Sequence, residues 1–135
     1  MRRAAAVALF LVLPFAPQPA RGAPAPSESG AEAIGRRFVD ELSAGEWEAA
    51  TEPFTDRMRE GLPPARLAAL WRALETRLDG FDRIEGASSA AGPGGGRVVW
   101  IRTRFVRGAV LIEVTVDEKR RIASFFVRSA APTIE

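Results

Sequence analysis

The segment that decides the fold is RVVWIRTRFVRGAVLIEVTV, residues 97–116. Apolar and polar side chains alternate on both sides of Arg107-Gly108, which is the period of a half-buried β-strand. Because glycine suits a tight turn, these two residues predict a two-residue hairpin. A slip of one residue would turn the apolar side chains to the wrong face. In the predicted register one face is almost wholly apolar, and it pairs Phe105 with Val110, Thr103 with Ile112, Ile101 with Val114, and Val99 with Val116.

The other face of this hairpin mixes charged and apolar side chains. In the same register Arg102 lies opposite Glu113, which predicts a cross-strand ion pair worth about 0.2–1 kcal/mol. Arginines interleaved with aromatic residues are also found in nucleic-acid platforms. Here the alternation explains them better as the outer face of a sheet.

A last strand over 121–128 completes this outer face. Depending on the turn before it, the strand adds either Phe125 and Val127 or Ile122 and Phe126. Apolar side chains rimmed by charge are typical of contact surfaces, unless the linker or a helix of the same chain covers them. We expect a docking surface for a second copy or for another exported protein, formed by Trp100, Arg102, Arg104, Leu111, Glu113 and Phe125.

Three segments before the strands show the helical period. The first contains Ala31, Ile34, Phe38 and Leu42, the second Trp47, Ala50, Phe54 and Met58, and the third Leu67, Leu70, Trp71, Leu74 and Leu78. Pro53 predicts a kink or a restart inside the second segment. Pro64 suits the first residue of the third helix, and Asp79-Gly80 is expected to end it.

After Gly80 the period changes to two. Residues 81–87 predict a weak strand, and 90–96 predict a loop. The strands that follow are expected at 97–106, 109–116 and 121–128. Three helices followed by about four antiparallel strands predict an α+β fold, with the helices on one face of a curved sheet.

The N-terminus has the features of a secretory signal. Arg2-Arg3 is the positive region, and the apolar run Ala4–Phe15 is too short to span a membrane. Ala20-Arg21-Gly22 provides small residues for cleavage. We therefore expect an exported protein, periplasmic or secreted, with a signal peptide at 1–22, a linker at 23–30, a domain at 31–130 and a tail at 131–135.

The composition disfavours several classes of function. Loss of the three arginines in 1–22 leaves 16 basic residues against 17 acidic ones, a formal net charge of −1, which does not favour nucleic-acid binding. The chain has no His, Cys or Tyr, so it lacks the usual proton shuttle, thiol nucleophile and phenolic donor. We expect no catalytic residue, no metal site and no cofactor. The acids of the helical region fit a solvated face: Glu46, Glu48, Glu52 and Asp56.

The side chains between helices and sheet have two interpretations. They pack as an ordinary core, which is the simpler one, or they line a space for an apolar small molecule. In the second case the lining residues are Phe38, Phe54, Trp71, Leu74, Ile101, Thr103, Ile112 and Val114.

Several short motifs, in order, resemble domain-of-unknown-function family 3887, in the nuclear-transport-factor-2-like superfamily. They are Gly45-Glu46-Trp47, FTDRMREGLP (54–63), Leu67 with Trp71, LDGFDRI (78–84) and RIASFF (121–126). The resemblance covers about 31–130 and implies a cystatin-like cone, in which a curved sheet wraps a long helix and often encloses a pocket. Arg120 departs from the family pattern, in which glycine is frequent before the last strand.

The resemblance also implies a secreted or membrane-attached bacterial protein, and some relatives carry this domain ahead of an α/β-hydrolase. It brings no catalytic residues. Taken with the composition, it favours a non-catalytic exported module that binds a small ligand or has an accessory role. The alternative is a protein-interaction module, as a homodimer or as the partner of an exported hydrolase. A carboxylate-based enzyme is the third and least favoured reading.

Overall fold

The computed structural model describes residues 30–129, which form helices followed by a single antiparallel sheet. The predicted signal peptide, the linker as far as residue 29, and the tail lie outside the described residues. The helices are α1 (Gly30–Ala44), α2 (Trp47–Thr51), α3 (Asp56–Gly61) and α4 (Pro64–Leu78). The strands are β1 (Phe81–Ala91), β2 (Arg97–Phe105), β3 (Gly108–Val116) and β4 (Ile122–Ser129). The predicted α+β class is confirmed.

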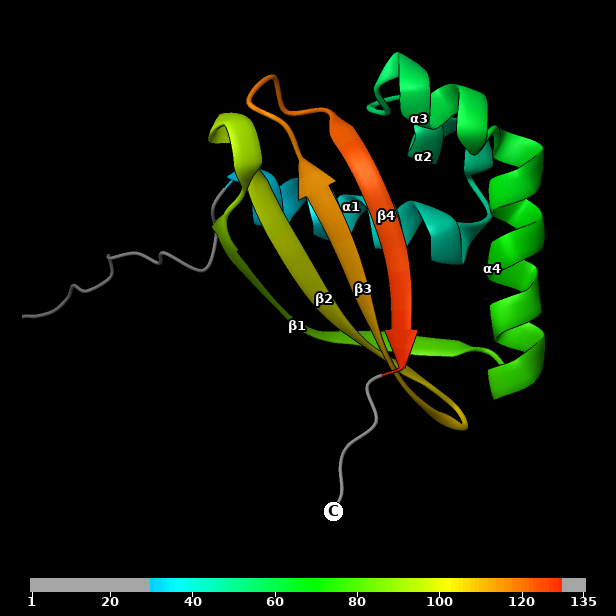
Figure 1. Cartoon of the computed structure of the whole chain (residues 1–135). Coiled ribbons are helices and arrows are strands. Elements are labelled where there is room, and N and C mark those ends of the chain that lie inside the picture. The colour runs from blue at the N-terminus through cyan, green and yellow to red at the C-terminus, as the bar shows by residue number, and fades with distance from the viewer. Residues whose placement is uncertain (1–29, 130–135) are drawn as a thin grey trace, which may run out of the picture.

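The sheet is a meander in which each strand pairs with the next along the chain, in the order β1-β2-β3-β4. α1 crosses one face of the sheet, and α4 stands alongside β4 (Figure 1). α2 and α3 lie near the N-terminal end of α4. β1 and β4 are therefore the two edge strands, and the edge at β4 is the one beside α4.

Proline and local capping set the helix boundaries. α2 stops at Thr51, so Pro53 causes a restart and not a kink. The new helix, α3, begins after Thr55, whose Oγ1 accepts a hydrogen bond from the Met58 backbone N–H at 3.2 Å. Pro64 occupies the first turn of α4, as expected, and Asp79 ends that helix in the left-handed conformation with φ 62°.

α1 lies very close to the sheet because Gly35 has no side chain. A Cβ atom at this position would lie 2.9 Å from Ile101 Cδ1 and 3.0 Å from Val99 Cγ1, both on β2. This approach buries the neighbouring Phe38 and Leu42 against the inner face of the sheet.

The Trp71 ring joins α4 to the first two strands. Its centroid lies 5.7 Å from that of Phe81 on β1 and 5.5 Å from that of Phe105 on β2. The predicted packing of Trp71 on the inner face is confirmed. Leu70, which the helical period placed in the same apolar stripe, is instead 38% exposed and turns away from the core.

The β2–β3 register differs from the predicted one by two residues. Phe105 pairs with Gly108, so the turn is Val106-Arg107 and not Arg107-Gly108. The N–H of Val106 donates to Gly80 O and the N–H of Arg107 donates to Leu78 O, both at 2.9 Å. These bonds to the end of α4 hold the turn in place. Because a shift of two residues preserves the alternation, every side chain of this hairpin keeps its predicted face.

The shifted register removes the predicted Arg102–Glu113 pair. Arg102 lies opposite Leu111, and Glu113 lies opposite Trp100. Glu113 instead forms an ion pair with Arg128 on β4, with 3.0 Å between Nε and Oε1.

A bulge near the start of β4 settles which aromatic residue faces outward. Val116 pairs with Ile122, but Thr115 pairs with Ser124, so β4 advances by two residues while β3 advances by one. As a result neither predicted alternative holds in full, because Phe126 faces outward while Ile122 is buried in the core. The assignment of Phe125 to the outer face is wrong.

Candidate functional site

The residues predicted to line a cavity fill the core. Seven of the eight are at most 2% exposed, namely Phe38, Phe54, Trp71, Ile101, Thr103, Ile112 and Val114, and Leu74 is half-buried. Thr103, the one polar member, donates its hydroxyl to Val110 O at 2.8 Å. The rings of Phe38 and Phe54 lie 5.8 Å apart between centroids. These contacts are those of core packing, the simpler of the two interpretations.

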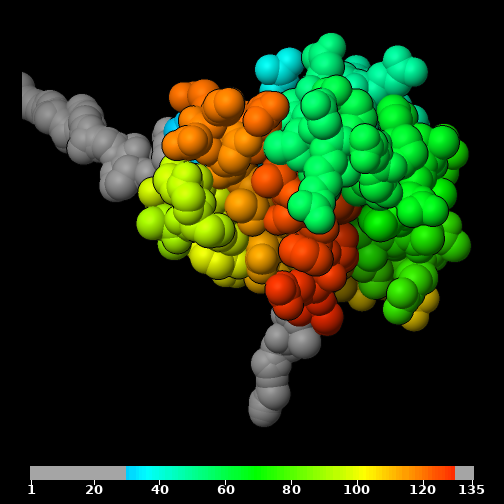
Figure 2. Space-filling model, turned by 45° about the horizontal axis from the view of Figure 1, so that its top comes forward, coloured from blue at the N-terminus to red at the C-terminus, as the bar shows by residue number. Residues whose placement is uncertain are grey.

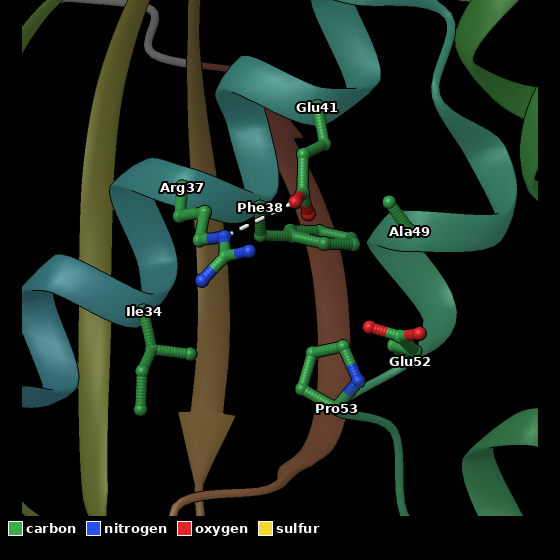
Figure 3. Close-up of a pocket in the computed structure, with 7 residues that line it drawn as sticks. All are labelled: Ile34, Arg37, Phe38, Glu41, Ala49, Glu52 and Pro53. Carbon is green, nitrogen blue, oxygen red and sulfur yellow. Dashed lines mark hydrogen bonds and ion pairs between the residues drawn. The ribbon is translucent and has the colours of Figure 1, made fainter.

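A first hollow lies between α1 and α2, with a volume of about 430 Å³. Figure 3 shows side chains of α1 reaching toward the opposite wall, which Ala49, Glu52 and Pro53 form. Two of its three charged side chains form an ion pair with each other, because Arg37 Nε lies 3.1 Å from Glu41 Oε2 one helical turn away. The full lining is Ile34, Arg37, Phe38, Glu41, Ala49, Glu52 and Pro53.

A second hollow, the α4–β4 groove, has a volume of about 490 Å³. α4 contributes Leu70, Ala73, Leu74 and Arg77, and β4 contributes Phe125, Phe126 and Val127. The helical residues follow the spacing i, i+3, i+4, i+7, so they form one stripe along α4. In the space-filling view the atoms of β4 (red) lie at the surface between those of β3 (orange) and α4 (green) (Figure 2).

The α4–β4 groove differs from the first hollow in its exposed apolar side chains and in its unpaired charge. Leu70 is 38% exposed and Phe126 is 52% exposed, and both line the groove. Arg77 in the last turn of α4 makes no ion pair or hydrogen bond with another residue of the described range. Unlike Arg37, it is a cation without an internal partner. The groove therefore offers apolar surface and an unmatched positive charge.

The predicted outer surface of the sheet is only partly assembled. Trp100, Arg102 and Leu111 line a shallow depression of about 260 Å³ together with residues 85–88. Glu113 and Phe126 extend this face across β3 and β4. Arg104 lies near Glu85, with 3.9 Å between Nε and Oε2.

Phe125 belongs to the inner side of the sheet. It pairs with Val114 and packs against the Phe38 ring at 5.1 Å between centroids. It therefore contributes to the core and to the α4–β4 groove, but not to the outer surface.

One buried acid was missed by the sequence reasoning. Glu32 in the first turn of α1 is 3% exposed, and its Oε2 accepts a hydrogen bond from the Ser89 hydroxyl at 2.9 Å. Arg97 in turn donates to the Ser89 oxygen from Nε and Nη2, at 3.2 and 3.1 Å. Glu32 shares a stripe with Gly35, at i+3, and that spacing is the signal that would have placed it inside.

Residues 30–129 contain no group of three or more acidic side chains placed to hold a metal ion. Within the same range no helix is long and apolar enough to cross a membrane.

Comparison with known proteins gives a family but no characterised relative. No curated protein matches the sequence. The family model described as "Protein of unknown function (DUF3887)" matches residues 36–125, which run from α1 to the Phe125 position that lines the groove. That match spans most of the described fold, and the chain therefore belongs to this family.

Proposed function

We propose that residues 30–129 form a non-catalytic binding module of an exported protein, and that the α4–β4 groove is its binding site. One observation carries the proposal. Of the three large apolar side chains exposed within the described residues, Leu70 and Phe126 line the groove, and only Val106 lies outside it. Apolar surface gathered in a concave site of this size is the usual character of a ligand pocket.

A binding role is favoured over catalysis because of the side chains available. The groove contains one charged residue, Arg77, and no acid, and the chain has no His, Cys or Tyr. The one charged residue buried in the described interior is Glu32, which is not part of the groove. Enzymatic turnover that disappears in Glu32→Gln would contradict the non-catalytic proposal.

Export is proposed from the signal features of residues 1–22, and a cone of the nuclear-transport-factor-2-like kind is proposed from the resemblance. Helices followed by a meander sheet, with α1 across one face, are compatible with such a cone. N-terminal sequencing of the exported protein should begin at Ala23. A retained Met1 in a membrane fraction would contradict export by cleavage.

The binding site is tested with an apolar fluorescent probe, 1-anilinonaphthalene-8-sulfonate, whose sulfonate suits Arg77. The wild-type protein should enhance the fluorescence of the probe, and Leu70→Ser and Phe126→Ser should each weaken its binding. Val106→Ser is the matched control, because Val106 is 68% exposed but lies outside the groove. Equal loss in all three variants, or no binding by the wild type, would remove the groove as a binding site.

A second candidate is a homodimer through the outer face of the sheet, or the docking there of an exported protein such as a hydrolase. The depression that contains Trp100, together with the exposed Phe126 on the same face, supports this alternative. Sedimentation of the wild type should then give a dimer, and Trp100→Glu should give a monomer. A monomeric wild type would remove the homodimer.

A further inference from the structure

The α4–β4 groove lies along the backbone edge of β4 and not over one face of the sheet. Its lining includes the consecutive residues Phe125, Phe126 and Val127. Consecutive side chains of a strand point to opposite faces, so a hollow that touches all three must follow the edge between the faces. β4 is an edge strand in the sheet order, and an edge strand presents unpaired N–H and C=O groups to whatever lies beside it.

The protein already uses the start of this edge for strand pairing. The N–H of Ile122 donates to Pro53 O at 2.7 Å, and the N–H of Thr55 donates to Ile122 O at 3.0 Å. These bonds make a parallel bridge between Phe54 and Ile122. Within residues 30–129 no other backbone segment pairs with the outer side of β4, so the bridge ends at Ile122, before the groove residues Phe125, Phe126 and Val127.

The opposite wall suits a single extended chain. The stripe on α4 from Leu70 to Arg77 is about 10 Å long at the helical rise, and three strand residues cover about the same length. α4 stands alongside β4 (Figure 1), and the hollow of about 490 Å³ that both elements line matches a single extended segment in length.

The charge of the groove specifies the segment further. Arg77 is the one charged side chain in the lining, and it has no partner among the described residues. A carboxylate on the incoming segment would complement it, while apolar side chains would cover Leu70, Leu74 and Phe126.

We infer that the α4–β4 groove takes an extended peptide segment that pairs with the outer edge of β4, with apolar residues at alternate positions and an acidic residue beside Arg77. In this mode the backbone bonds supply affinity and the alternate side chains supply specificity. The inference rests on the proposed function, because it names the class of ligand for the same groove.

The test uses the full chain and a fluorescently labelled, end-blocked peptide of alternating valine and threonine with one central glutamate. Fluorescence anisotropy should show saturable binding. Two further forms of the peptide carry N-methyl groups on alternate backbone nitrogens. One form is methylated at the odd-numbered residues and the other at the even-numbered residues, so that each form blocks the N–H groups of one edge. At least one of them should lose about tenfold in affinity, because strand pairing needs its N–H groups. Hydrogen exchange should show new protection of amides within residues 123–129 when the parent peptide binds.

The acidic position is tested by exchange of charge. Arg77→Glu should lower the affinity for the glutamate peptide roughly two- to fivefold. It should raise the affinity for the same peptide with lysine in place of glutamate by a similar factor. Arg66→Glu, on the same helix but outside the groove, is the matched control and should change neither affinity. Circular dichroism checks that both variants keep their fold.

The outcomes separate the two proposals. If the naphthalene probe binds in the groove but the peptide does not, or if both methylated forms bind like the parent, strand pairing is wrong and the binding site stands. If neither the probe nor the peptide binds, the proposed function fails as well.

Discussion

The indole Nε1 of Trp100 on β2 lies 3.3 Å from Oε1 of Glu113 on β3. The same oxygen accepts a hydrogen bond from Arg128 Nε on β4, at 3.0 Å. One carboxylate oxygen therefore links three consecutive strands on the outer face of the sheet. The Glu113 side chain is only 19% exposed, so both bonds are partly shielded from water.

The first prediction concerns this carboxylate. Glu113→Ala should lower the free energy of unfolding by about 1–2 kcal/mol, because it leaves two donors without their acceptor. Glu113→Gln keeps an acceptor oxygen and should cost less than about 1 kcal/mol, as expected when only a partly exposed ion pair is lost. Urea titration of both variants checks the difference. Equal losses would show that the charge, and not the acceptor, matters.

The second prediction concerns Trp71, which is 1% exposed. Trp71→Ala should cost about 3–5 kcal/mol, as for other large truncations in a core. Trp71→Phe should cost clearly less, because the Trp71 Nε1 has no hydrogen-bond partner among the described residues and a ring still packs against Phe105. A loss under about 1 kcal/mol for Trp71→Ala in denaturant titration would contradict the position of α4.

The third prediction compares neighbouring arginines in the β3–β4 turn. Arg120 has φ 67°, in the left-handed region that favours glycine. Arg120→Gly should therefore stabilise the protein by roughly 0.5–1 kcal/mol. Arg121→Gly should destabilise it by about 1 kcal/mol, since it loses the ion pair with Asp117, 3.4 Å between Nε and Oδ2. Shifts of the melting temperature in the same direction for both variants would contradict this account.

The fourth prediction concerns pH. The pKa of the Asp117 carboxyl is lowered, chiefly because the backbone N–H of Arg121 donates to it at 2.8 Å, with a further bond from the Lys119 N–H. A lowered pKa in the folded state adds stability above about pH 4, the range of an unfolded aspartate, and this contribution is lost as the pH falls through the folded pKa. Asp117→Asn should therefore be less stable than the wild type at pH 7.

The same comparison is then made in acid. At pH 3 the gap between the urea midpoints of Asp117→Asn and the wild type should be narrower than at pH 7, because the wild-type carboxyl is losing its charge. An equal gap at both pH values would show that the charge of Asp117 does not contribute.

Local sequence patterns predicted most of the fold because the type and spacing of neighbouring residues determine where helices, strands and turns form. Alternation around 97–116 placed each side chain of that hairpin on its observed face. Proline at 53 and 64 marked helix boundaries correctly. The hairpin register was missed because its turn is held by the carbonyl groups of Leu78 and Gly80, which belong to another part of the chain.

The candidate site was less predictable for the same reason. Leu70 shares the helical period of the core residues, yet it lines the α4–β4 groove and is 38% exposed. The bulge that turns Phe126 outward follows the turn that contains Arg120, a residue with φ 67°. The spacing of apolar residues predicts neither the position of α4 beside β4 nor the bulge in β4.

The open edge of β4 also affects how the protein behaves when α4 loosens. Residues 122–127, IASFFV, contain no charge and no proline, a composition typical of segments that stack into cross-β aggregates. In the folded chain α4 stands alongside this strand and forms the opposite wall of the groove. Trp71 anchors α4 against β1 and β2, so loss of that anchor would remove this wall and leave the edge of β4 open to other chains. The packing of α4 therefore also protects the folded protein from aggregation through β4.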